Sequence, residues 1–95
     1  MSKFRRAARI DSNQPGIVKE LRKRGFSVEL GHDDILVGIH GRTFWYEIKE
    51  PETISKSGKP YNLKLSQEKL LENYKGHYKI VWTIEQILDD INSHD

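Results

Sequence analysis

The chain has 95 residues, of which 32% are charged and 36% apolar, and its formal net charge is +2. This length predicts one domain with a single modest hydrophobic core. The chain contains no cysteine, which excludes disulfide bridges and thiolate metal sites. No apolar run is long enough for a signal peptide or a membrane span, so a cytoplasmic protein is expected.

Charge is divided unevenly along the chain. Residues 1–64 carry 13 Lys and Arg against 8 Asp and Glu, whereas residues 65–95 carry 3 against 6. A basic first part suits an anionic partner such as nucleic acid, although an ordinary solvated basic surface would have the same composition. We expect a basic arm over residues 1–10 and a folded domain over residues 11–95.

The first half of the domain predicts a helix and three strands. The segment 11–25 reads "DSNQPGIVKELRKRG". Its polar residues at 11–13 can cap a helix, Pro15 suits the first turn and Gly25 suits the end. An alternating strand follows at 26–30, and two more strands are expected in "DILVGIH" and "TFWYEIKE".

The second half predicts a loop, a helix, a strand and a last helix. The loop at 51–64 is long and rich in lysine, which in a small domain is more often functional than idle. A helix is expected from Ser66, a strand at 77–82, and a final helix that opens on a capping box of Thr83 and Gln86. This order predicts a single α/β domain with a mixed central sheet flanked by helices.

The turn between the second and third strands decides which side chains meet. If Gly41 and Arg42 form a two-residue type II′ loop, Asp34 lies opposite Lys49 and diagonal to Glu47. A loop one residue longer would place Asp34 on the other face of the sheet. The favoured register therefore gathers two carboxylates and an ammonium group at one end of the hairpin.

Two carboxylates at this spacing offer hard oxygen ligands to Mg²⁺ or Mn²⁺. A neighbouring lysine can hold a water molecule or neutralise charge on a phosphate. The alternative is an ordinary cross-strand ion pair, which on a surface contributes less than about 1 kcal/mol. The apolar neighbours "ILVGI" and "FWY" favour a site, because charges near a core need a reason.

These residues carry a family resemblance. With Asp34, Glu47 and Lys49 spaced as D…E-x-K, "DDILVG" and "RTFWYEIKE" resemble the PD-(D/E)XK nuclease superfamily. More narrowly, the chain is similar to small VRR-NUC and Holliday-junction-resolvase-like nucleases of phages and bacteria, from residue 9 to residue 90. The resemblance implies a restriction-endonuclease-like α-β-β-β-α-β-α fold and a metal-dependent endonuclease that cleaves DNA, with a preference for Holliday junctions or other branched DNA.

The resemblance also implies roles for individual residues. Asp34 and Glu47 would bind Mg²⁺ or Mn²⁺, Ile48 would offer its backbone carbonyl to the same ion, and Lys49 would serve the attacking water. Gln14 occupies the position where relatives often carry an acidic residue of the first helix, and its amide can bind through its carbonyl or through water. Cutting two strands symmetrically needs two sites, so a homodimer is expected.

Contacts with the DNA backbone are expected from the basic arm and the lysine-rich loop. The candidates are Arg5, Arg6, Arg9, Lys56, Lys59, Tyr61 and Lys64. Two alternatives remain open from the residues alone. The chain can be a nucleic-acid-binding module without catalysis, in which the D…E-x-K charges are structural, or a domain whose basic face meets an acidic protein. The residues do not distinguish DNA from RNA.

Overall fold

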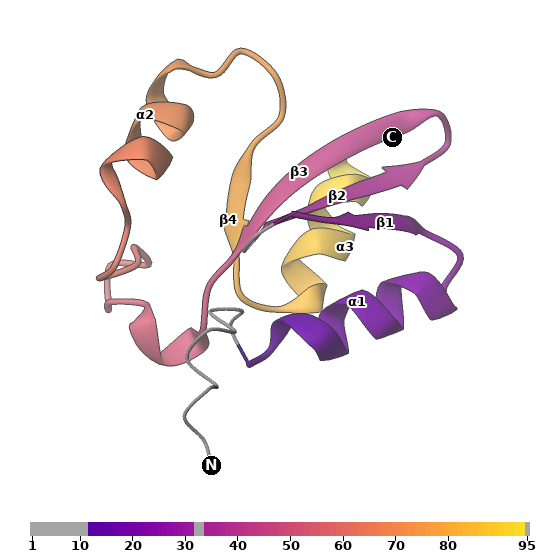
Figure 1. Ribbon diagram of the computed structural model, residues 1–95, viewed down its shortest axis with the longest axis horizontal. Helices are drawn as coiled ribbons and strands as arrows, with labels where there is room; N and C mark the ends of the chain where they lie inside the picture. The colour runs from indigo at the N-terminus through magenta and orange to yellow at the C-terminus, as the bar shows by residue number, and fades with distance from the viewer. Residues whose placement is uncertain (1–11, 32–33, 95) are drawn as a thin grey trace.

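The computed structural model describes residues 12–31 and 34–94 (Figure 1). Within these residues the chain forms a small α/β domain of three α-helices and a four-stranded mixed sheet. This confirms the predicted fold class and element order. The elements are α1 (Gln14–Lys23), β1 (Ser27–Leu30), β2 (Asp34–Ile39), β3 (Arg42–Ile48), the short 3₁₀-helix η2 (Pro51–Thr53), α2 (Leu65–Asn73), β4 (Lys79–Val81) and α3 (Ile84–Ser93).

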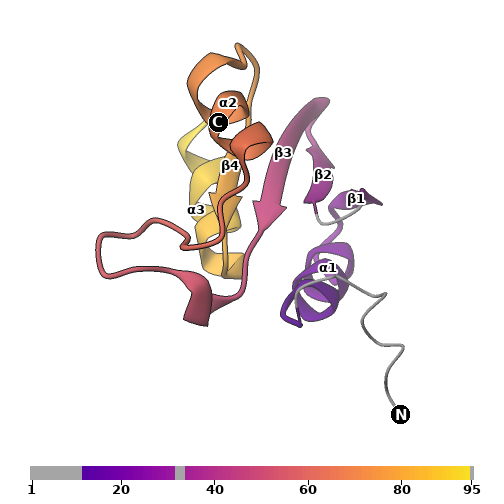
Figure 2. The same cartoon turned by 60° about the vertical axis from the view of Figure 1, so that its left-hand side comes forward.

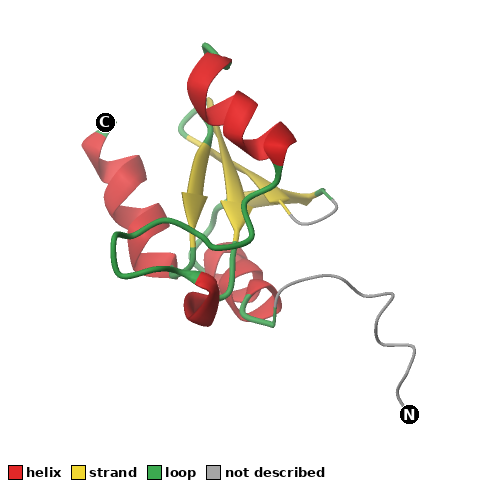
Figure 3. Ribbon diagram, turned by 90° about the vertical axis from the view of Figure 1, so that its left-hand side faces the viewer, coloured by secondary structure: helices red, strands yellow, loops and turns green. Residues whose placement is uncertain are grey.

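The strands follow their chain order across the sheet. β1, β2 and β3 form an antiparallel meander, and β4 then pairs in parallel with β3. The parallel pair requires the long crossover that contains η2 and α2. In Figure 1, α2 lies on the β4 side of the molecule, away from α1, and Figure 3 shows the same separation from a second direction.

One face of the sheet forms the core. Alternation along β3 buries Phe44, Tyr46 and Ile48 on this face, where Ile35 and Val37 of β2 join them. Helices α1 and α3 cover it with apolar side chains at helical spacing, namely Ile17, Val18, Leu21, Ile87 and Ile91. The opposite face of the same strands remains more open: Leu36 is 43% exposed.

The β2–β3 turn differs from the prediction. The last pair of the ladder is Ile39 with Arg42, so His40 and Gly41 form the two-residue loop. Both have positive φ, 54° and 76°, as a type I′ turn requires. Histidine is among the residues that tolerate this conformation, so Gly41 can take the second loop position. The predicted Gly41-Arg42 type II′ loop is therefore wrong.

The shifted turn changes partners but keeps faces. Asp34 lies opposite Glu47, and the predicted pairing of Asp34 with Lys49 is wrong. Moving the loop by one residue moves every pairing by two positions along β3, and side chains two positions apart share a face. Asp34 thus stays on the face of Trp45 and Glu47.

The helix ends mostly follow the local signals. Gly25 follows α1 with a φ of 95°, a conformation that a side chain would strain. The predicted capping box of Thr83 and Gln86 opens α3. Helix α2 begins at Leu65, one residue before the predicted start. None of the helices in the described part of the chain has the length and apolar character needed to cross a membrane.

Candidate functional site

The two carboxylates of the candidate site face each other across the β2–β3 ladder. Asp34 is the first residue of β2, and its partner Glu47 lies near the end of β3. Glu47 is 4% exposed, whereas Asp34 is half-buried. Directly opposed residues have Cβ atoms about 5 Å apart, which is close enough for two carboxylates to share one cation.

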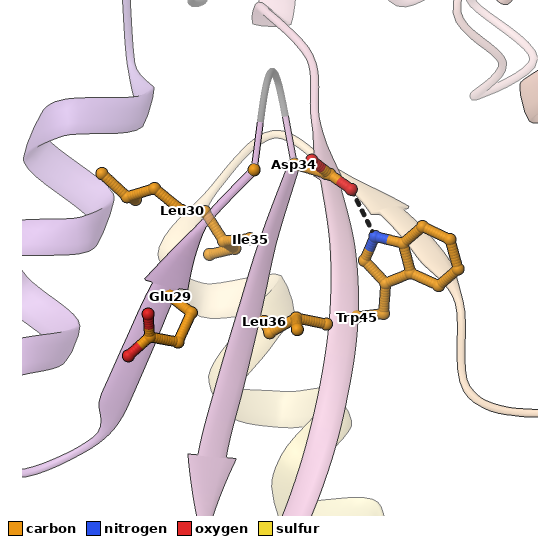
Figure 4. A pocket seen from close by; sticks show the side chains of 7 residues that line it. Glu29, Leu30, Asp34, Ile35, Leu36 and Trp45 are labelled. Carbon is orange, nitrogen blue, oxygen red and sulfur yellow. Dashed lines mark hydrogen bonds between the residues drawn. The ribbon is translucent and has the colours of Figure 1, made fainter.

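Asp34 is held by residues on either side of it. Its Oδ2 accepts a hydrogen bond of 2.6 Å from the indole Nε1–H of Trp45, as Figure 4 shows. The backbone N–H of Gly31 donates to the Asp34 carbonyl at 2.8 Å. A Cβ on residue 31 would overlap Asp34 Oδ1. Glycine at this position therefore makes room for the carboxylate.

Lys49 lies two residues beyond Glu47 and is 4% exposed. Its backbone N–H donates to the Val81 carbonyl at 2.9 Å, so the pairing with β4 continues past the end of β3. Alternation along an extended chain directs residues 47 and 49 to the same side. A lysine buried near two carboxylates is better placed to neutralise anionic charge than one in solvent.

The start of α1 is fastened to this end of the sheet by Asn13. Its Nδ2 donates to the carbonyls of Lys49 and Trp82, both at 3.0 Å. The next residue, Gln14, is 2% exposed, and its Oε1 has no hydrogen-bond partner among the described residues. An acceptor buried without a partner costs about 1–3 kcal/mol, so it suits a bound water or a cation.

Glu50, two residues after the end of β3, bonds to Ser12, the residue before Asn13. Its Oε2 accepts a hydrogen bond of 2.7 Å from the backbone N–H of Ser12. This bond lowers the pKa of the Glu50 carboxyl below its ordinary value. The residues just before α1 and just after β3 are therefore joined at the candidate site.

The donor set suits a hard cation that retains part of its water shell. The described residues contain no group of three or more His, Cys, Asp or Glu that could hold a metal ion. The chain instead offers the opposed carboxylates of Asp34 and Glu47 and the Ile48 carbonyl, while Gln14 belongs to the buried side of α1, which covers the other face of the sheet. Mg²⁺ commonly binds one or two carboxylates and completes its shell with water and substrate phosphate. The residues present therefore fit Mg²⁺ or Mn²⁺.

The predicted DNA contacts are placed only in part. The side chains of the loop lie exposed on the segment between β3 and α2, at Lys56, Lys59, Tyr61 and Lys64, and Tyr61 is 74% exposed. Figure 2 shows this loop extending to one side of the domain. Arg5, Arg6 and Arg9, with the predicted arm at 1–10, lie outside the described residues.

Sequence reasoning missed three supporting residues. Trp45, which belongs to the predicted strand "TFWYEIKE", bonds directly to Asp34 through its indole N–H. The sequence did not signal this bond, because Trp45 lies diagonal to Asp34 when Asp34 pairs with Glu47 but not when it pairs with Lys49. Asn13, one of the polar residues expected to cap the first helix, is the N-cap residue of α1, but its side chain donates to the carbonyls of Lys49 and Trp82 and makes no cap hydrogen bond. Gly31 directly follows the predicted strand at 26–30 and leaves room for the Asp34 carboxylate.

The comparisons with known proteins found no relative of this chain that bears on the site. No protein-family model matches the chain, and neither a curated protein nor a solved structure matches it. The chemistry of the site is therefore inferred from the geometry of Asp34, Glu47 and Lys49.

Proposed function

We propose that this chain is a Mg²⁺- or Mn²⁺-dependent endonuclease of the PD-(D/E)XK type, similar to VRR-NUC nucleases, that hydrolyses phosphodiester bonds of DNA. The observation that carries the proposal is the pairing of Asp34 with Glu47 across the hairpin. Lys49 follows on the same side of β3, and Gln14 presents a buried oxygen without a partner among the described residues.

Each residue has a defined part in the proposed hydrolysis. Asp34, Glu47 and the Ile48 carbonyl would hold the cation. When bound, the cation polarises a phosphoryl oxygen and lowers the pKa of a coordinated water. Lys49 orients the attacking water and neutralises charge that develops on the phosphate. The attacking water releases one proton to solvent as its oxygen bonds to phosphorus, the bond from phosphorus to one ester oxygen breaks, and that oxygen takes up a proton from solvent and leaves as a hydroxyl group.

The proposal extends to substrate and assembly. Branched DNA, including the four-way junction, is the proposed substrate, and a homodimer would supply the two sites for paired cuts. The exposed lysines of the 51–64 loop and the basic arm supply the charge that a phosphate backbone requires. A cytoplasmic protein of bacterial or phage origin completes the proposal.

A non-catalytic nucleic-acid-binding module is the second candidate. The bond from Trp45 Nε1 to Asp34 favours it, because a carboxylate with a protein donor already has a structural role. In that case the basic segments would bind DNA while Asp34, Glu47 and Lys49 stabilise the hairpin.

One experiment separates the two candidates. The protein is incubated with junction, flap and linear DNA and with a matching RNA, in Mg²⁺, in Mn²⁺ and in EDTA. We expect metal-dependent cleavage of branched DNA that Glu47→Gln reduces by roughly 100-fold or more while DNA binding remains. Glu85→Gln, an exposed acid in the first turn of α3, is the matched control and should cleave normally.

The opposite results are equally informative. Binding without cleavage in either metal would establish the binding module and remove the nuclease. Absence of DNA and RNA binding at low salt would remove both candidates and leave a protein partner for the basic face.

A further inference from the structure

The open face of the sheet carries a cavity beside Asp34. Its volume is about 320 Å³, and its lining includes Glu29, Leu30, Asp34, Leu36 and Trp45 (Figure 4). The strand register explains the shape: Glu29 of β1 pairs with Leu36 of β2, which pairs with Trp45 of β3. The three side chains form one row across the sheet, with Leu36 as the floor and the other two as walls.

The Trp45 wall is held from behind. Tyr74 and Tyr78 make edge-to-face contacts with the Trp45 ring at centroid distances of 5.3 and 4.7 Å, and neither tyrosine lines the cavity. The indole N–H is fixed on Asp34. The ring is therefore oriented before any ligand arrives, which lowers the entropic cost of stacking on it.

The charges of the cavity exclude one ligand class and favour another. Among the described residues, its charged lining side chains are the acids Glu29 and Asp34, and it is lined by no lysine or arginine. A phosphate group would be repelled there. A nucleobase has flat apolar faces that stack on an aromatic ring, and amino groups that donate hydrogen bonds to carboxylates.

We propose that this cavity binds a single unpaired nucleobase of the DNA substrate, next to the phosphate that is cut. The inference rests on the proposed nuclease function and gives its preference for branched DNA a physical cause. A paired base must leave its stack to enter the cavity, at a cost of a few kcal/mol, whereas a base at a branch point is already unstacked. Because Glu29 accepts hydrogen bonds, cytosine and adenine should be preferred to thymine.

The test uses 2-aminopurine, a fluorescent base whose emission falls when it stacks on an aromatic ring. It is placed at the branch point of a flap and, in a second oligonucleotide, inside a duplex arm. Binding is measured in EDTA, so that the readout does not depend on cleavage. We expect quenching at the branch point and little change within the duplex.

A matched pair of leucines provides the variants. Leu36 on the cavity floor is 43% exposed and Leu71 on α2 is 46% exposed, so neither substitution empties the core. Leu36→Glu should abolish the quenching and weaken binding of branched DNA by roughly tenfold, as expected for loss of one stacked base. Leu71→Glu should leave both unchanged.

The outcomes separate this inference from the nuclease proposal. Quenching that depends on Leu36 supports the base site even if no metal supports cleavage. Metal-dependent cleavage without quenching, or with Leu36→Glu and Leu71→Glu behaving alike, overturns the base site and leaves the nuclease. Loss of self-association in Leu36→Glu with unchanged fluorescence would assign the cavity to a protein contact and overturn the base site. Absence of DNA binding would overturn both proposals.

Discussion

The two faces of the sheet hold their acidic residues in different ways. On the core face, Asp90 of α3 is buried and interacts with Tyr46 Oη at 2.6 Å, His77 Nε2 at 2.7 Å and Lys79 Nζ at 3.4 Å. The His77 Nδ1 accepts a hydrogen bond of 3.1 Å from the backbone N–H of Trp45, so the His77 Nε2 carries the proton given to Asp90. On the open face, Asp34 is half-buried beside a cavity. The contrast distinguishes an acid saturated by structural donors from one that lies beside a cavity.

The ionisation of the Asp90 network follows from these contacts. Burial alone would raise the pKa of Asp90, but hydrogen bonds from Tyr46 and His77 and the charge of Lys79 outweigh it and hold the pKa below its ordinary value. Burial and the bond to Asp90 raise the pKa of Tyr46. Tyr46 lies between Trp45 and Glu47 on β3, so the network on the core face fixes the strand that presents the open-face residues.

The largest effect on cleavage is expected from removing the charge of Asp34 on the open face. Asp34→Asn retains an acceptor for the Trp45 N–H but removes the negative charge from the candidate metal site. We expect metal-dependent cleavage to fall by roughly 100-fold or more, with a change in the free energy of unfolding below about 1 kcal/mol. Single-turnover cleavage and urea unfolding measure the two quantities. A large loss of unfolding free energy alongside the loss of cleavage would show that Asp34 is structural.

The corresponding change on the core face is directed at the hydrogen bond between Tyr46 and Asp90. Tyr46→Phe removes the hydroxyl that donates to Asp90 and preserves the ring that packs in the core. The variant should lose about 1–3 kcal/mol of unfolding free energy, because a buried carboxylate loses a donor. At a temperature where it remains folded, its cleavage rate should match the wild type. A rate reduced as strongly as in Asp34→Asn would mean that the faces are not independent.

A smaller effect is expected from the glycine beneath Asp34. In Gly31→Ala the new methyl group would overlap the Asp34 carboxylate, so the acid must move. We expect roughly tenfold slower cleavage, since small displacements of catalytic groups are costly. Gly16→Ala in α1 is the control, because nothing lies within 4 Å of its Cβ position; it should stabilise the helix by about 0.5–1 kcal/mol without affecting cleavage. Unchanged cleavage in Gly31→Ala would argue against this positioning role.

Part of the loss of unfolding free energy at low pH should come from Asp90. Its folded pKa is lowered, so its contribution is fully present above the ordinary aspartate value of about 4 and is lost as the pH falls through the folded pKa. Urea unfolding between pH 2 and pH 7 should show a shallower loss of stability in Asp90→Asn than in wild type. The same pH dependence of the unfolding free energy in both proteins would show that folding does not lower the pKa of Asp90.

Local signals in the sequence were enough for the element order. Proline and glycine bounded α1, the Thr83 capping box opened α3, and strand alternation in "FWYEI" puts Phe44, Tyr46 and Ile48, all of them buried, on one face. Each of these signals depends on residues within a few positions of one another, so each could be read without tertiary information. Given a two-residue loop, they also place Asp34 and Glu47 on the same face, because any loop of that length preserves the parity.

The tertiary structure decided which residues meet. Turn signals could not choose between Gly41-Arg42 and His40-Gly41, because two adjacent loops of equal length differ only in backbone dihedral angles and in the twist of the strands they join. Three sets of contacts join residues that lie 11 to 69 positions apart in the chain. They are the bond from Trp45 to Asp34, the bonds from Asn13 to the carbonyls that follow β3 and β4, and the contacts of Asp90 with Tyr46 and Lys79. Such contacts arise only when the packed helices and strands bring distant segments together, and they determine which acid is structural and which faces a cavity.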